Sequence, residues 1–115
     1  MSQALLSRAY GAAQQVRSLR EQEADVFRRV NYSLKAALTA DTINKARAIS
    51  DNRRLWLGVE AALSHPANQL PAATRQAILR LGRAIQREMD NQQPDISFLV
   101  EMNDQIIAGL SGNPG

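Results

Sequence analysis

Asn52-Arg53-Arg54-Leu55-Trp56, near the middle of this 115-residue chain, contains its only tryptophan. Read at about 100° per residue, the surrounding sequence fits a helix with one apolar face. That face is formed by Ile49, Leu55, Trp56, Val59 and Leu63. Asn52 falls within the same face, although a buried amide without hydrogen-bond partners costs roughly 1–3 kcal/mol. Two interpretations are open: Asn52 bonds a backbone group at the end of a neighbouring helix, or this edge is the floor of a groove for a partner chain.

The side chains that flank this face carry further expectations. Arg53 lies three positions before Trp56, so a cation–π contact with the indole is within reach. Ile43 and Leu57 fall on the polar side of the same helix, where isolated exposed apolar residues are normal. Gly58 and Arg54 are also placed on the polar side.

Apolar periodicity and boundary signals divide the chain into about five amphipathic helices. The expected ranges are 3–17, 19–40, 43–63, 72–91 and a last helix from 96 to about 109. Ser18 and Glu21 form a capping box at the start of the second helix. Asp41 or Thr42 caps the third, and Asp95 caps the last. No segment of strand period is longer than a few residues, so the predicted fold is all-α.

The first, second and fourth helices have apolar stripes. In the second, the stripe consists of Val26, Phe27, Val30, Leu34, Ala37 and Leu38. In the first, the stripe consists of Leu5, Leu6, Ala9, Tyr10, Ala13 and Val16, and in the fourth of Ala77, Ile78, Leu81, Ile85 and Met89. Pro71 suits the first turn of the fourth helix, where a missing N–H does no harm. We predict one small helical bundle over residues 1–110, followed by a flexible tail over residues 111–115.

Composition narrows the class of protein. Hydrophobic residues make up 44% and charged residues 22%, as in ordinary soluble domains, while only 4% are aromatic. We therefore expect an aliphatic core. The chain has no cysteine, which excludes disulfides, zinc–thiolate sites and thiol nucleophiles. No run approaches the length of about 18 apolar residues that spans a bilayer. The first twenty residues lack a continuous apolar region, so we interpret them as part of the fold and expect a cytoplasmic protein.

The sequence offers no constellation for catalysis. His65 is the only histidine and lies in a loop beside Pro66. The acids are spread along helix faces rather than clustered, and there is no glycine-rich phosphate loop. We predict no enzymatic activity, no catalytic or metal-binding residue, no cofactor and no small-molecule substrate. The pairs Arg28-Arg29 and Arg53-Arg54 could bind RNA phosphates, but a solvated helix face is the favoured interpretation.

From about Tyr10 to Leu110 the chain resembles the flagellar regulatory protein family FlaF. The resemblance is carried by Asn52-Arg53-Arg54-Leu55-Trp56, Asn68-Gln69-Leu70-Pro71, Arg75-Gln76-Ala77-Ile78, Leu99, Asn103, Ile106-Ile107 and Gly109-Leu110. The central motif followed at this spacing by the Leu-Pro helix start is fairly specific, whereas each alone is weak. The family brings no catalytic residues and no cofactor.

The resemblance implies a cytosolic protein of flagellum biogenesis that acts with flagellin, in a pathway shared with the regulator FlbT. We expect chaperone-like binding of flagellin, which promotes its synthesis or export, by a helix held in a groove. The candidate partner-binding residues are Asn52, Arg53, Arg54, Leu55, Trp56 and Leu57. The alternative is a regulator of flagellin translation that acts on the message or with FlbT. We expect no membrane insertion.

Overall fold

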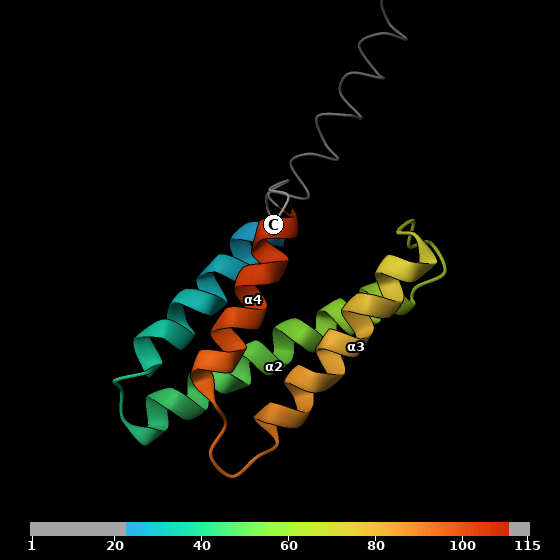
Figure 1. Ribbon diagram of the computed structural model, residues 1–115. Helices are drawn as coiled ribbons and strands as arrows, with labels where there is room; N and C mark the ends of the chain where they lie inside the picture. The colour runs from blue at the N-terminus through green and yellow to red at the C-terminus, as the bar shows by residue number, and fades with distance from the viewer. Residues whose placement is uncertain (1–22, 111–115) are drawn as a thin grey trace, which may run out of the picture.

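The computed structural model describes residues 23–110, which form four helices and no strand. The first spans residues 23–37 and is called helix 23–37 below. It is followed by α2 (Thr42–Ser64), α3 (Ala72–Met89) and α4 (Ile96–Leu110) (Figure 1). The all-α class is confirmed. The expected count of about five is not reached within the described part, because the helix predicted over residues 3–17, like the tail over residues 111–115, lies outside it.

The helix boundaries follow from the capping residues that the sequence displays. The Asp41 carboxylate accepts a hydrogen bond from the Asn44 backbone N–H at 2.8 Å, which starts α2. The Asp95 carboxylate accepts one from the Phe98 backbone N–H at 3.2 Å, which starts α4. Pro71 occupies the N-cap of α3 rather than its first turn. α3 ends at Met89, two residues before the expected end.

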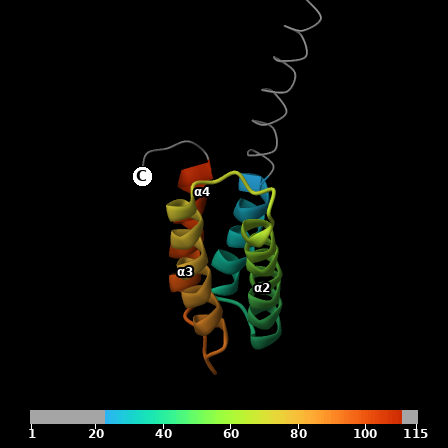
Figure 2. The ribbon, with the colours of Figure 1, turned by 90° about the vertical axis from the view of Figure 1, so that its right-hand side faces the viewer.

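The four helices are arranged as two layers. Figure 1 shows helix 23–37 beside α4, and α2 beside α3. Figure 2, turned by 90°, shows helix 23–37 and α2 in one layer and α3 and α4 in the other. The two side-by-side pairs diverge toward the end where α2 finishes and α3 begins (Figure 1). None of the described helices is long and apolar enough to cross a membrane.

The core is mainly aliphatic, as the composition predicts, and draws on all four helices. Its buried members are Phe27, Leu34, Ala37, Ala48, Trp56, Ile85, Met89, Ile96 and Leu99. The aromatic exception is a T-shaped pair in which the Phe27 and Trp56 ring centroids lie 5.8 Å apart at an interplanar angle of 84°. This pair joins helix 23–37 to α2.

Some apolar residues do not follow the expected stripes. Ile43 and Leu57 are exposed, in agreement with their placement on the polar side of α2. Val26 and Leu38, assigned to the inner face of the second helix, are also exposed, and so is Ala77 of α3. Leu38 is exposed because it lies in the turn after helix 23–37, which ends three residues before its predicted end at residue 40.

Candidate functional site

Four side chains from three helices, among them Asn52 and Trp56 of the central motif, form a buried chain of hydrogen bonds. The Trp56 Nε1–H of α2 donates to Asn103 Oδ1 of α4 at 2.9 Å. Asn103 Nδ2 donates in turn to Asn52 Oδ1 of α2 at 2.8 Å. Asn52 Nδ2 then reaches the Met89 sulfur of α3 at 3.4 Å. We call Trp56, Asn103, Asn52 and Met89 the buried network.

The buried network explains why an amide interrupts the apolar face of α2. Asn52 and Asn103 are 0% exposed and Trp56 is 2% exposed, so each polar atom in this region needs a protein partner. Asn52 finds its partners in side chains of α3 and α4, not in a backbone group at a helix end. In this structure Asn52 and Trp56 therefore hold the helices together.

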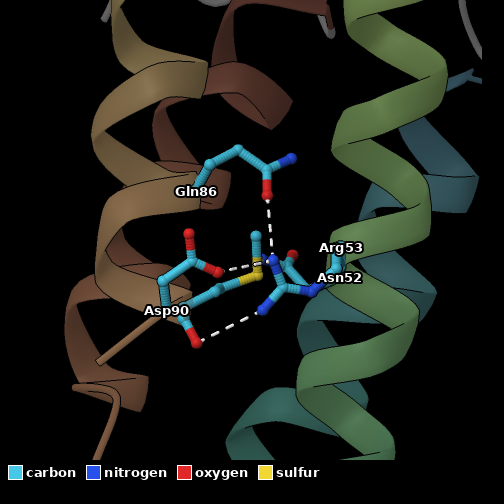
Figure 3. A network of polar contacts seen from close by, with 5 residues as sticks. Asn52, Arg53, Gln86 and Asp90 are labelled. Carbon is cyan, nitrogen blue, oxygen red and sulfur yellow. Dashed lines mark hydrogen bonds and ion pairs between the residues drawn. The ribbon is translucent and has the colours of Figure 1, made fainter. Parts of the chain in front are cut away.

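Arg53, not Asn52, makes the predicted hydrogen bond to a backbone group at the end of a neighbouring helix. Its guanidinium donates to the backbone carbonyl of Met89 at 3.3 Å, at the C-terminus of α3 (Figure 3). It also pairs with the Asp90 carboxylate at 2.9 Å and contacts Gln86 Oε1 at 3.4 Å. The last carbonyls of a helix have no partner within the helix, and a cation is favourable there. The expected cation–π contact with Trp56 is not found in the described part, because the guanidinium is turned toward α3.

Gly82 allows α3 to approach the tryptophan closely. A Cβ added at this position would lie 3.2 Å from Trp56 Cε3, tighter than an ordinary van der Waals contact. Sequence reasoning missed this role, because Gly82 and Trp56 lie far apart in the chain and only the packing of α3 on α2 brings them together. Gly58 differs, since an added Cβ there would meet nothing within 4 Å.

An apolar groove of about 410 Å³ opens where the helix pairs diverge. Helix 23–37, α2, the α2–α3 loop, α3 and α4 all contribute to it. Its lining residues, which define the apolar groove below, are Glu23, Val26, Phe27, Arg54, Leu55, Gly58, Val59, Ala62, Leu63, Asn68, Leu70, Ile78 and Ile106. Val26 and Leu70 are 40% and 38% exposed, so apolar side chains face the opening.

The loop that closes one end of the apolar groove is held by its own polar side chains. Asn68 Nδ2 donates to the Ala62 carbonyl of α2 at 3.0 Å. Asn68 Oδ1 accepts from the Leu70 backbone N–H, also at 3.0 Å. This brings Leu70 back over the end of α2 and adds it to the groove wall. His65 accepts a hydrogen bond from the Ala67 backbone N–H at 3.0 Å and so belongs to the same loop structure.

The lining of the apolar groove is mainly apolar. Glu23 and Arg54 are the two titratable side chains among its lining residues. Within residues 23–110 no group of three or more metal-ligating side chains is found. An apolar floor with a sparse polar rim is the geometry that accepts the apolar face of an amphipathic helix. Groove residues from four helices are brought together only by the fold, which sequence reasoning did not foresee.

The structure divides the six candidate partner-binding residues into three groups. Asn52 and Trp56 are buried in the network, and Arg53 is bound to α3. Arg54 and Leu55 line the apolar groove. Leu57 is 52% exposed and is not among the groove residues. Contact of any of them with a partner stays a prediction, but only Arg54 and Leu55 lie at the groove.

A second buried asparagine contact fastens helix 23–37 to α4. Asn31 is buried, and its Nδ2 donates to Asp104 Oδ1 at 2.8 Å and to the Val100 carbonyl at 3.3 Å. Lys35 lies 3.9 Å from the same Asp104 carboxylate. Each helix pair is thus held by polar contacts of its own: Asn31 joins helix 23–37 to α4, and Arg53 joins α2 to α3.

The described part of the chain is thus all-α and has an apolar groove. A comparison with protein-family models matches residues 6–110 to the family described as flagellar protein FlaF. Since this match covers nearly the whole chain, the protein belongs to the FlaF family, which confirms the resemblance seen in the sequence. Membership assigns it a role in flagellum biogenesis. Searches of curated proteins and of solved structures gave no match.

Proposed function

We propose that the protein is a non-enzymatic, cytoplasmic adaptor that binds unassembled flagellin in the apolar groove and promotes its synthesis or export. The observation that carries this proposal is the groove itself, an open apolar surface formed by all four described helices. Flagellin is the partner that the family resemblance implies. Its terminal helices are amphipathic and prone to aggregation while they are exposed in the monomer.

The geometry supports recognition through apolar contact with a charged rim. Along α2 the groove runs from Leu55 to Leu63, about 12 Å at 1.5 Å per residue, or just over two helical turns. Val26 and Leu70 line the groove with partly exposed apolar side chains. Arg54 at the rim favours an acidic side chain at the edge of the bound helix. Burial of the apolar face would supply the affinity, and the rim would set the orientation.

The test is calorimetric titration of the protein with monomeric flagellin at low and moderate salt. The proposal predicts binding that persists at moderate salt, with a negative heat-capacity change from apolar burial. Affinity that falls steeply with salt for the flagellin message instead would favour the translational alternative. No binding of flagellin at either salt would overturn the proposal and direct the search to FlbT as the direct partner.

A control substitution outside the groove distinguishes binding at the groove from binding by the central motif as a whole. Leu57 belongs to the motif region but not to the groove, and its exposed side chain tolerates charge. We expect Leu57→Glu to keep the fold and to bind flagellin with unchanged affinity. A large loss of flagellin affinity in Leu57→Glu would place the flagellin contact on the outer face of α2 instead.

A further inference from the structure

The net positive charge of the chain lies on α3. This helix contains four arginines, Arg75, Arg80, Arg83 and Arg87, and one acidic residue, Glu88, which gives it a formal charge of +3. The complete sequence has the same net charge of +3, so the rest of the chain is neutral overall. Charge of one sign that is concentrated on a single helix attracts a partner of the opposite sign.

Three of these arginines form a row along one side of α3. Arg80, Arg83 and Arg87 follow one another at intervals of three and four residues, which places them on one helix face, and all three are exposed. Within residues 23–110, every ion pair found is made by other basic side chains. These three residues, called the arginine row below, are therefore free to pair with carboxylates from another molecule.

An apolar crevice of about 310 Å³ lies between α2 and α3, beside the arginine row. We call it the α2–α3 crevice. Trp56, Val59 and Leu63 of α2 and Ile78 and Leu79 of α3 make its lining mainly apolar. Along α3 the crevice extends over residues 78–87, about 14 Å at 1.5 Å per residue, which is the length of two to three helical turns.

The charged residues of the α2–α3 crevice are unevenly placed. Arg83 and Arg87 line it on the α3 side, and Glu60 lines it on the α2 side. Leu79, Arg83 and Arg87 do not line the apolar groove, although the two surfaces are neighbours and share Val59 among their lining residues. The crevice can therefore be altered by substitutions that leave the lining of the groove unchanged.

The lining of the crevice favours a protein helix over a nucleic acid. Proteins that bind single strands stack the bases on exposed aromatic side chains. Trp56 is the aromatic residue in the crevice lining and is only 2% exposed, so its ring cannot stack on a base. Val59, Ile78 and Leu79 are half-buried and offer apolar contacts instead. Arginine pairs with carboxylates in a bidentate geometry, so a helix with acidic residues beside its apolar stripe matches both features.

We infer that the α2–α3 crevice is a second docking surface, which binds an acidic amphipathic helix of a partner protein. Apolar side chains of that helix enter the crevice, and its carboxylates pair with Arg83 and Arg87. Arg80 extends the arginine row beyond the crevice and accepts a further acid. Glu60 repels an acid on the α2 side, so the acidic edge of the bound helix faces α3. This inference goes beyond the proposed function, which assigns flagellin to the apolar groove.

A designed amphipathic peptide tests the inference with the full chain. The acidic peptide has leucines at helical spacing and glutamates along one edge of that stripe, and the matched neutral peptide has glutamines in place of the glutamates. Fluorescence anisotropy of the labelled peptides, without flagellin, gives the two affinities. We expect the chain to bind the acidic peptide at least about tenfold more tightly than the neutral one. Equal affinities would overturn the inference.

Charge-reversed variants locate the peptide on the surface, after circular dichroism has shown that they keep their helical content. Arg83→Glu combined with Arg87→Glu should weaken the acidic peptide at least about tenfold. The matched control is Arg29→Glu with Arg47→Glu, two exposed arginines outside the crevice whose reversal changes the net charge by the same amount. We expect a loss below about threefold in this control. Equal losses in the two double variants would show attraction by net charge alone and would overturn the inference.

A second pair of variants tests the apolar part of the contact. Leu79→Gln should weaken the acidic peptide, whereas Leu57→Gln, at an exposed position outside the crevice, should leave its affinity unchanged. Equal affinities of these two variants would overturn docking in the crevice. Loss of the peptide in Gly58→Glu, with its affinity kept in the Arg83 and Arg87 double variant, would place the peptide in the apolar groove and also overturn the inference.

The other possible occupants have outcomes of their own. An oligouridylate that binds more tightly than the acidic peptide, and that the Arg83 and Arg87 double variant no longer binds, would assign the surface to nucleic acid. A dimer of the unchanged chain in analytical ultracentrifugation that this double variant abolishes would assign it to a second copy. Either result would overturn the inference.

Titration with monomeric flagellin separates this inference from the proposed function. If both hold, the Arg83 and Arg87 double variant loses the acidic peptide and binds flagellin with unchanged affinity. Peptide binding that meets these tests, together with no flagellin binding, would support the crevice and overturn only the proposed function. Flagellin binding with no preference for the acidic peptide would support the proposed function and overturn only the second docking surface.

Discussion

The two sides of α2 differ in whether neighbouring helices cover them. The side that faces α3 and α4 is closed and contains Asn52, with its hydrogen bonds satisfied. The side that faces the groove is open and contains Leu55, Gly58 and Val59. On the closed side polar side chains thus add hydrogen bonds to the apolar core, and on the open side apolar side chains remain for binding. A buried amide pairs only with particular partners, so it fixes how the helices meet and thereby the shape of the groove.

This comparison predicts that changes on the closed side lower stability, whereas changes on the open side affect partner binding. The largest effect should come from Trp56→Ala. It removes a buried indole that contacts Phe27 and Gly82 and leaves Asn103 Oδ1 without its donor. We expect the free energy of unfolding to fall by about 3–5 kcal/mol. Urea unfolding followed by circular dichroism measures this loss; unchanged stability with flagellin binding lost would make Trp56 a contact residue after all.

Asn103→Leu should have the next largest effect. The substitution leaves the Trp56 Nε1–H and Asn52 Oδ1 buried without partners, and each such group costs about 1–3 kcal/mol. Asn44→Leu is the matched control, because Asn44 is exposed at the start of α2 and a surface change should stay within about 0.5 kcal/mol. Equal unfolding midpoints for the two variants in urea would show that the buried network does not stabilise the fold.

The same substitution at Gly82 and at Gly58 should change the stability in opposite directions. Gly82→Ala forces a methyl group to within 3.2 Å of the buried Trp56 ring, which we expect to lower the stability by about 1 kcal/mol or more. Gly58→Ala meets open space in the groove and gains helix propensity, so it should raise the stability by about 0.5–1 kcal/mol. The melting temperatures of both variants measure these two changes in stability. A rise for Gly82→Ala would mean that α3 can move away from the indole.

The smallest effect is expected at the edge of the closed side. The Arg53–Asp90 ion pair is largely exposed, so Asp90→Asn should cost less than about 1 kcal/mol, and high salt should reduce the loss. Arg53→Gln should cost somewhat more, because the bond to the Met89 carbonyl is also lost. A double-mutant cycle measured by urea unfolding gives the coupling free energy between Arg53 and Asp90. A coupling above about 2 kcal/mol would show that this contact is part of the core.

The sequence predicts the helices well because their signals are local. Asp41 and Asp95 cap the helices that they were expected to cap, and Asn52 stood out as a polar residue in an apolar stripe. The partners of Asn52 could not be predicted, because Asn103 and Met89 reach it only through the packing of α3 and α4. The groove was equally hidden, since it depends on the angle between helix pairs. Val26 and Leu55 belong to ordinary apolar stripes, and periodicity alone does not tell whether a stripe is covered.

The central claim, that the apolar groove binds a partner helix, is tested most directly at Gly58. Monomeric flagellin is titrated calorimetrically into the full chain and into Gly58→Ala and Gly58→Glu, after circular dichroism has shown that both variants keep their helical content. The account predicts that Gly58→Ala binds within about threefold of the unchanged protein. Gly58→Glu places a charged side chain at an exposed position of the groove lining and should bind at least about tenfold more weakly, a loss of about 1.4 kcal/mol. Equal affinity of Gly58→Glu and Gly58→Ala for flagellin would contradict the claim.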